Sequence, residues 1–529
     1  MGLLVAAVGG VAAFWIIGPD NTVRSGEQHV VGKGLAIAST PQLLDRHGPI
    51  LHVEARSAGG KPVFVGVGRD FDVASYLKGV AHTSLVQLTY PIALTTQEQK
   101  GSADPLTVPA NLDWWVTKAA GTGSQAIRWP IEDGPYDVVI MSADGKTAPD
   151  VQVRVGVEIP NAFLITLGVF VGGLLILALG ILLIVIRRRP ATPVAAPFAA
   201  PPTAQQPTAP APFGTTYRVL AGTVVLGLVT GCSVVPERDT VTKLTRPAVS
   251  TEAGQAVIKR YNEVSTSAGR SRNEVQIGQV EGGDLVKQTR AAYAIGRNLK
   301  RPIPKPPTYT KPTFAVPEYS SYPMQFVTTE GSAVGLWQRE SAGSPWLRTM
   351  AANLEKSAKL PDLTGLRPAT KTDGKDLVLP PQTAATALSQ YLSAEGKSPQ
   401  GASFTVLPQF GKRFKDLAGN RALWTKHKLA VRVGRTYSVA TPPATFITRG
   451  GEAVVLATLR DQYEVVVANN AYFFWDSGDG TAFSRPSTRY TSGLTSTTLH
   501  DVVLVVPRKG KGKIRIAAYE TQMVDAGGY

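Results

Sequence analysis

Four basic residues near the end of the chain are the clearest candidates for ligand binding. The stretch "HDVVLVVPRKGKGKIRIAAYE" predicts a β-hairpin whose turn carries Arg508, Lys509, Lys511 and Lys513. Cationic side chains on an exposed turn could bind phosphate or carboxylate groups. Turns also carry charge simply because charged residues stay hydrated, so the sequence leaves both interpretations open.

The only cysteine of the chain, Cys232, lies near the end of an apolar run, "VLAGTVVLGLVTGCSVV". Val229, Thr230, Gly231 and Cys232 resemble the lipobox of bacterial lipoproteins. The resemblance implies that Cys232 is the lipidated residue and that the bond between Gly231 and Cys232 is cleaved. A third transmembrane helix over residues 217–235 with an incidental cysteine fits the same residues, and both alternatives stay open.

Motifs for catalysis are incomplete. Ser75 and Lys78 have the Ser-x-x-Lys spacing of penicillin-binding enzymes, but the partner motifs of those enzymes are missing. The six histidines show no metal-binding spacing. The sequence therefore predicts a protein that is not an enzyme, with no cofactor and no metal.

Two hydrophobic segments predict a membrane topology. Residues 162–186 run for 25 positions without a charge, more than the roughly 20 residues that a membrane-spanning helix needs. Arg187, Arg188 and Arg189 follow at once, and such clusters stay on the cytoplasmic side. Residues 19–160 are then predicted to lie outside, so residues 3–18 form either a first transmembrane helix or a signal anchor.

A proline- and alanine-rich segment connects the halves of the chain. With the arginine cluster it covers residues 187–216, and its composition favours an extended cytoplasmic tether. The segment 217–235 then leads the chain back out, which predicts a multi-pass protein of the cell membrane with both large regions outside.

The formal net charge of +16 is concentrated in the C-terminal half, where residues after Arg218 carry 39 Lys+Arg and 24 Asp+Glu. An extracytoplasmic location argues against nucleic acid as the partner. Besides the lipid bilayer, it favours anionic lipid head groups, anionic wall polymers or another envelope protein.

Short apolar and β-branched runs recur between turn signals over residues 19–160, for example "ILHVEARSA", "PVFVGVG" and "VQVRVGVEI". Alternating side chains in these runs predict an all-β sandwich. The stretches "SGEQHVVGKGLAIASTPQLLDRHGP" and "VFVGVGRDFDVASYLKG", with the span that ends in three arginines, resemble a family of uncharacterised actinobacterial membrane proteins over residues 1–190. The resemblance implies topology and no activity.

The C-terminal half alternates helical and β-rich patterns twice. It predicts two α+β units, residues 236–370 and 371–529, each with helix packed on an antiparallel sheet. Residues 217–529 resemble an uncharacterised domain of actinobacterial lipoproteins, and each unit loosely resembles cystatin-like or NTF2-like folds.

These features together predict a membrane-anchored cell-envelope protein that displays a non-catalytic binding or scaffold module outside the membrane. The alternative is an extracytoplasmic hydrolase that acts on cell-wall or lipid material.

Overall fold

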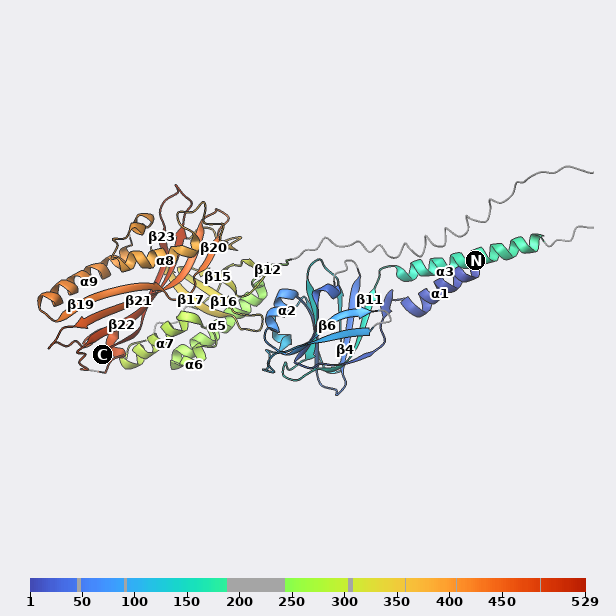
Figure 1. Ribbon diagram of the computed structural model, residues 1–529, viewed down its shortest axis with the longest axis horizontal. Helices are drawn as coiled ribbons and strands as arrows, with labels where there is room; N and C mark the ends of the chain where they lie inside the picture. The colour runs from blue at the N-terminus through green and yellow to red at the C-terminus, as the bar shows by residue number, and fades with distance from the viewer. Residues whose placement is uncertain are drawn as a thin grey trace, which may run out of the picture. The chain divides into compact units, whose positions relative to one another are not determined.

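The chain divides into two units, residues 1–244 and 245–529, which we call the N-terminal and C-terminal units and describe separately. The structure is a computed structural model (Figure 1). It describes residues 1–44, 49–89, 93–187, 243–302, 308–356, 358–405, 407–485 and 487–529.

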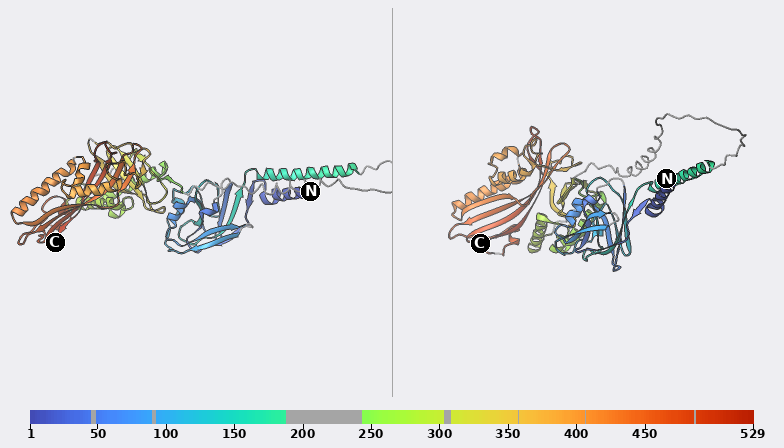
Figure 2. Two further views of the ribbon diagram at one scale, coloured as in Figure 1. Left: turned by 45° about the horizontal axis from the view of Figure 1, so that its top comes forward. Right: turned by 45° about the vertical axis from the view of Figure 1, so that its right-hand side comes forward.

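Two apolar helices of the N-terminal unit pack side by side and antiparallel (Figures 1 and 2). One consists of α1 (Gly2–Val11) and its continuation η1 (Ala12–Ile17), and the other is α3 (Ala162–Arg187). A Cβ atom on Gly9 would come within 2.5 Å of the backbone nitrogen of Phe170. One on Gly173 would come within 2.3 Å of the backbone nitrogen of Ala6. These glycines therefore permit the close approach of the two backbones.

The outer surface of this helical pair is apolar and exposed. Among the described residues, one helix is long and apolar enough to cross a membrane, residues Ala162–Ile186, and 6% of its most apolar window is buried. The shorter helix Gly2–Ile17 covers the segment predicted to cross first. The segment predicted to cross third, residues 217–235, lies outside the described residues.

The remainder of the described N-terminal unit is β-rich. A five-stranded sheet has the order β1-β11-β4-β9, with β2 paired to β11, and a six-stranded sheet has the order β7-β6-β3-β10-β5-β8. The strands are β1 (Thr22–Arg24), β2 (Gln28–Val31), β3 (Ala36–Ser39), β4 (Ile50–Ser57), β5 (Val63–Arg69), β6 (His82–Thr89), β7 (Ala93–Gln99), β8 (Thr117–Gly121), β9 (Ser124–Pro130), β10 (Tyr136–Ser142) and β11 (Asp150–Glu158). The helices are η2 (Pro41–Leu44), α2 (Asp70–Tyr76) and η3 (Pro109–Asn111).

The two sheets share one hydrophobic core, the arrangement of a β-sandwich. On β4 the alternate residues Leu51, Val53 and Ala55 are buried in it, together with Val65 of β5 and Ile140 of β10. This is the period of two that a strand with one buried face requires.

The C-terminal unit is built on one ten-stranded sheet with the order β13-β15-β16-β17-β23-β22-β21-β20-β18, and β19 pairs with β21. Its ten strands are β13 (Thr313–Ala315), β15 (Met324–Glu330), β16 (Ala333–Arg339), β17 (Leu347–Leu354), β18 (Arg367–Pro368), β19 (Ala430–Val439), β20 (Ala444–Ile447), β21 (Ala453–Val467), β22 (Gly493–Val506) and β23 (Arg515–Gly528). A separate two-stranded sheet pairs β12 (Arg246–Pro247) with β14 (Glu318–Tyr319). The helices of the C-terminal unit are α5 (Thr251–Ser271), α6 (Glu274–Ile277), α7 (Gly283–Asn298), α8 (Pro381–Ser393), η4 (Pro399–Ser403), α9 (Pro408–Lys426) and η5 (Asp479–Ala482).

The single sheet differs from the two predicted units, residues 236–370 and 371–529. Each part does contribute helices and antiparallel strands, but β17 pairs with β23 at Asn353–Tyr519 and Leu354–Ala518. This pairing satisfies backbone groups that two separate sheets would leave at exposed edges. The boundary at residue 370 therefore does not separate two sheets.

The central strands β21 and β22 are buried on both faces. Val455 and Val502 pack with α8 in one core, whereas Val454 and Val503 point the other way and pack with residues of β15, β16 and β17. The helices α8 and α9 lie along the outer face of this part of the sheet (Figure 1). The continuous apolar stretch of β22 is thus explained by burial on two sides.

Candidate ligand-binding cleft

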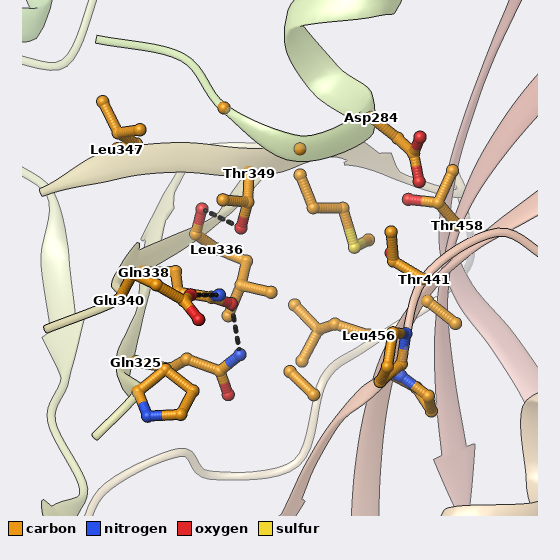
Figure 3. Close-up of a pocket in the computed structure, with 18 of the residues that line it drawn as sticks. Asp284, Gln325, Leu336, Gln338, Glu340, Leu347, Thr349, Thr441, Leu456 and Thr458 are labelled. Atoms are coloured by element: carbon orange, nitrogen blue, oxygen red, sulfur yellow. Dashed lines mark hydrogen bonds between the residues drawn. The ribbon is translucent and has the colours of Figure 1, made fainter. Parts of the chain in front are cut away.

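A cleft of about 720 Å³ opens in the C-terminal unit between two parts of the folded sheet. Strands β15, β16 and β17 form one wall, and β20 and β21 form the other (Figure 3). The two parts share a core, but β17 pairs with β23 only near its C-terminal end. The walls therefore separate towards the N-terminal end of β17, where the cleft lies. Leu336, Met350 and Leu456 extend this core into an apolar floor.

A row of hydrogen-bonded polar side chains crosses one wall. Gln325 of β15 lies directly opposite Gln338 of β16, and its Nε2 donates to Oε1 of Gln338 at 2.8 Å. Nε2 of Gln338 then donates to Oε2 of Glu340 at 2.8 Å (Figure 3). The row fixes the orientation of both amides and of a carboxylate at the outer end of the cleft.

A buried carboxylate lies at the inner end of the cleft. Asp284, in the first turn of α7, is 2% exposed and lies beside Thr458 (Figure 3). Its Oδ1 accepts from Nζ of Lys287 at 2.8 Å, whereas its Oδ2 has no hydrogen-bond partner among the residues that the structure describes. The positive end of the helix dipole stabilises an anion at this position.

A glycine pair sets the start of α7. Gly283 has a φ of +59°, a left-handed conformation that favours glycine. A Cβ atom on Gly282 would lie 2.9 Å from Cδ1 of Leu347. Both residues line the cleft, so the turn that they form places Asp284 against β21 rather than in solvent.

A second carboxyl group lies directly behind Thr458. The Thr458 hydroxyl donates to Oδ1 of Asp501 at 2.6 Å, and the backbone N–H of Ala351 donates to Oδ2 at 3.2 Å. Asp501 is fully buried, and this burial raises its pKa to about 7, with a further contribution from the charge of Asp284. The inner end of the cleft thus holds the carboxylate of Asp284 beside a carboxyl group, Asp501, that titrates near neutral pH.

The opposite face of the same strands carries an ionic cluster around a buried carboxylate. Oδ2 of Asp461 lies 3.1 Å from Nε2 of His500 and accepts from Arg435 at 2.5 Å and from Arg413 at 3.4 Å. Nδ1 of His500 lies 2.8 Å from the hydroxyl of Tyr519. Burial lowers the pKa of His500, so the ring is neutral near pH 7. The ring of His500 is 0% exposed, and no residue of the cluster lines the cleft.

The predicted basic residues lie at an exposed hairpin turn. The turn between β22 and β23 exposes Arg508, Lys509, Lys511 and Lys513, as the sequence predicts. Nζ of Lys509 donates to the carbonyl of Lys375 at 2.7 Å. None of the four lines the described part of the cleft.

The other predicted site residues fall at or beyond the end of α3. Arg187 is the last residue of that helix. Arg188 and Arg189 lie outside the described residues, as do Val229, Thr230, Gly231 and Cys232, so their roles stay predictions.

Sequence reasoning missed the cleft, although one signal for it is present. In "LHDVVLVV" a histidine and an aspartate precede an apolar run, and buried charged residues require partners. The described residues contain no group of three His, Cys, Asp or Glu side chains that could hold a metal ion.

A β-rich domain with a polar cleft is the class that the fold and the site define. A family description, Domain of unknown function (DUF8094), matches residues 245–528, the whole of this sheet and its helices. The chain therefore belongs to that family. No curated protein and no solved structure matches the chain.

Proposed function

We propose that the protein is a membrane-anchored component of the cell envelope whose C-terminal unit binds a ligand outside the membrane without transforming it. The observation that carries this proposal is the cleft, because its acceptor groups are held in place before any ligand arrives. The actinobacterial and lipoprotein resemblances belong to the same proposal.

The helical pair supports the membrane anchor. Two apolar helices that pack through glycine, with exposed apolar outer surfaces, suit a lipid environment. The sandwich follows the first helix and precedes the second along the chain, and the two helices pack antiparallel. In the proposed topology the sandwich is outside, and Arg187, Arg188 and Arg189 are inside.

The burial of the cluster of His500 and Asp461 supports binding rather than hydrolysis. A general base must reach a substrate proton directly or through one water. His500 and Asp461 are 0% and 1% exposed and are held by Arg435 and Tyr519. The carboxylates at the cleft lack such a histidine partner among the described residues, so the cleft is better suited to recognition.

Membrane topology provides the first test. Single cysteines would replace Thr122, Ala195 and Ser477 in a chain carrying Cys232→Ala, and intact cells would be treated with a membrane-impermeant maleimide. Thr122 and Ser477 are exposed on their units. We expect labelling at positions 122 and 477 and labelling at 195 only after permeabilisation. Protection of position 477 in intact cells would contradict the proposed display.

Turnover provides the second test. Purified full chain would be incubated with cell-wall and lipid fractions, and products would be followed by mass spectrometry. We expect none. A product that disappears in both Asp284→Asn and Glu340→Gln would establish the hydrolase alternative.

Processing at Cys232 is tested by an immunoblot against the C-terminus in native membranes. If the lipobox functions, a fragment of the size of residues 232–529 appears and is lost in Cys232→Ala and when lipoprotein signal peptidase is inhibited. A full-length band in every sample would make Cys232 incidental.

A further inference from the structure

The cleft is acidic although the C-terminal unit is strongly basic. Residues 245–529 carry 37 Lys+Arg against 22 Asp+Glu. Yet the described residues that line the cleft include Asp284 and Glu340 and include no lysine, arginine or histidine. Such a local reversal of charge favours positively charged ligands, because like charges are repelled and opposite charges are attracted.

The polar groups of the cleft are mainly acceptors. The row from Gln325 to Glu340 uses an N–H group of each glutamine internally and ends in a carboxylate. At the inner end the hydroxyl of Thr458 is donated to Asp501, and Oδ2 of Asp284 is left without a donor in the described structure. A ligand that supplies donors fits this arrangement.

We propose that the cleft binds an organic cation, with an ammonium or guanidinium group against Oδ2 of Asp284 and an apolar stem over Leu336 and Met350. This inference rests on the proposed binding function and names its ligand class. A second donor on the ligand reaches Glu340 at the outer end of the cleft. The cation can belong to a small amine or to a basic side chain of a partner protein.

The burial of Asp284 makes a cationic group the fitting occupant. An unpaired acceptor atom on a buried carboxylate costs free energy, and a charge-assisted hydrogen bond recovers it. Lys287 pairs with the other oxygen through a side chain that is 56% exposed, and Oδ2 of this cleft-lining aspartate is left without a partner in the described structure. A neutral ligand could donate a hydrogen bond to Oδ2 of Asp284, but it would bring no positive charge to the carboxylate.

Proton release gives an independent signature of this binding mode. The groups that face Asp501 include Asp284 and the side chain of Gln288 from α7, Thr458 from β21, the N–H of Ala351 from β17 and Glu520, its cross-strand neighbour on β23. A cation beside Asp284 favours the ionised form of Asp501 and lowers its pKa. Binding at about pH 6.5 to 7 therefore releases protons.

The experiment uses the full chain in nanodiscs of zwitterionic lipid and isothermal titration calorimetry in two buffers of different ionisation enthalpy. The probes are 1,5-diaminopentane and Nα-acetyl-lysine amide, with 1,5-pentanediol and glutarate as neutral and anionic counterparts. We expect the two cations to bind with proton release and the counterparts not to bind. The cation that binds more tightly shows whether the ligand is a free amine or a basic side chain of a partner protein.

Variants locate the site. Asp284→Asn should weaken cation binding about 10- to 100-fold, because it removes a buried charge-assisted contact. Glu340→Gln, at the exposed end, should weaken it about two- to fivefold. Asp416→Asn, a carboxylate paired with Lys412 on the surface of α9, is the matched control and should change nothing. If Asp284→Asn fails to fold, the test rests on whether Glu340→Gln weakens cation binding relative to the control.

Three outcomes would overturn the inference. Equal binding of pentanediol or glutarate would show a cleft of another specificity and leave the binding function intact. Cation binding unchanged in both cleft variants would place the site elsewhere. Absence of binding by every probe would remove the ligand class, while the topology and turnover measurements still judge the proposed function separately.

Discussion

Two neighbouring residues of β22, His500 and Asp501, point to opposite faces of the sheet and have contrasting environments. Towards α9, His500 contacts Asp461, whose charge is balanced by Arg435 and Arg413. Towards the cleft, Asp501 contacts neutral hydrogen-bonding groups, which are a hydroxyl, a backbone N–H and the side chain of Gln288.

The contrast shows two ways to hold a carboxyl group in a protein interior. A buried charge is tolerated when the protein supplies counter-charges, as for Asp461, and otherwise the group takes up a proton, as for Asp501. The first solution supplies the counter-charge from within the fold, although Oδ1 of Asp461 and Nε of Arg435 have no hydrogen-bond partner in the described structure. The second leaves the group sensitive to pH and to a nearby ligand, which is why we place function on the cleft face.

Removing the charge of Asp461 should have the largest effect. Asp461→Asn leaves Arg435 and Arg413 without their shared carboxylate in a poorly hydrated site. We expect a loss of about 3–5 kcal/mol in the free energy of unfolding, measured by denaturant titration. The control Asp416→Asn removes an exposed pair with Lys412 and should cost less than about 0.5 kcal/mol. Similar losses in both variants would break the distinction between the two faces.

Neutralising Asp501 should instead stabilise the protein, and only at high pH. The ordinary pKa of the carboxyl group is 3.8, and burial raises it to about 7. Between these values the folded chain binds more protons than the unfolded chain, so stability falls as pH rises. Asp501→Asn cannot ionise. Its amide oxygen can still accept from the N–H of Ala351, and its NH2 group can donate to the Thr458 hydroxyl if that hydroxyl turns from donor to acceptor.

The expected gain for Asp501→Asn is on the order of 4 kcal/mol at about pH 8 and close to zero at about pH 4, from melting curves over this range. His500 has the opposite tendency, because its lowered pKa costs stability as pH falls below its ordinary value of 6.5. That contribution is the same in the wild type and in Asp501→Asn, so it cancels in the difference between their free energies of unfolding. A gain that is independent of pH would show that Asp501 is not protonated in the fold.

The sequence predicts the architecture where side-chain periodicity is simple. Alternation in "ILHVEARS" identifies β4, and the uncharged stretch 162–186 identifies α3. The join between β17 and β23 could not be predicted, because it involves two residue pairs more than 160 positions apart in the chain. Such long-range pairing leaves no local pattern, and two units with similar element order were inferred instead.

The site was harder to predict than the fold. The exposed basic turn is visible in sequence because its four charges are adjacent along the chain. The cleft is assembled from the start of α7, from β15 and β16 and from β21, so its carboxylates are far apart in sequence. The polar pair His500 and Asp501 was the one local sign, and only the fold reveals that its members face different neighbours.

The basic turn offers a third environment, in which the charged side chains are exposed to solvent, and should show the smallest effect on stability. Replacing Lys509, Lys511 and Lys513 with glutamine should change the free energy of unfolding by less than about 0.5 kcal/mol, because exposed charges contribute little. If the turn binds anionic surfaces, the same variant should lose salt-sensitive association with phosphatidylglycerol vesicles in a flotation assay. Replacing the exposed Lys412, Lys415 and Lys426 of α9 gives a control of equal charge. Equal losses in both variants would mean that net charge, rather than the turn, attracts the membrane.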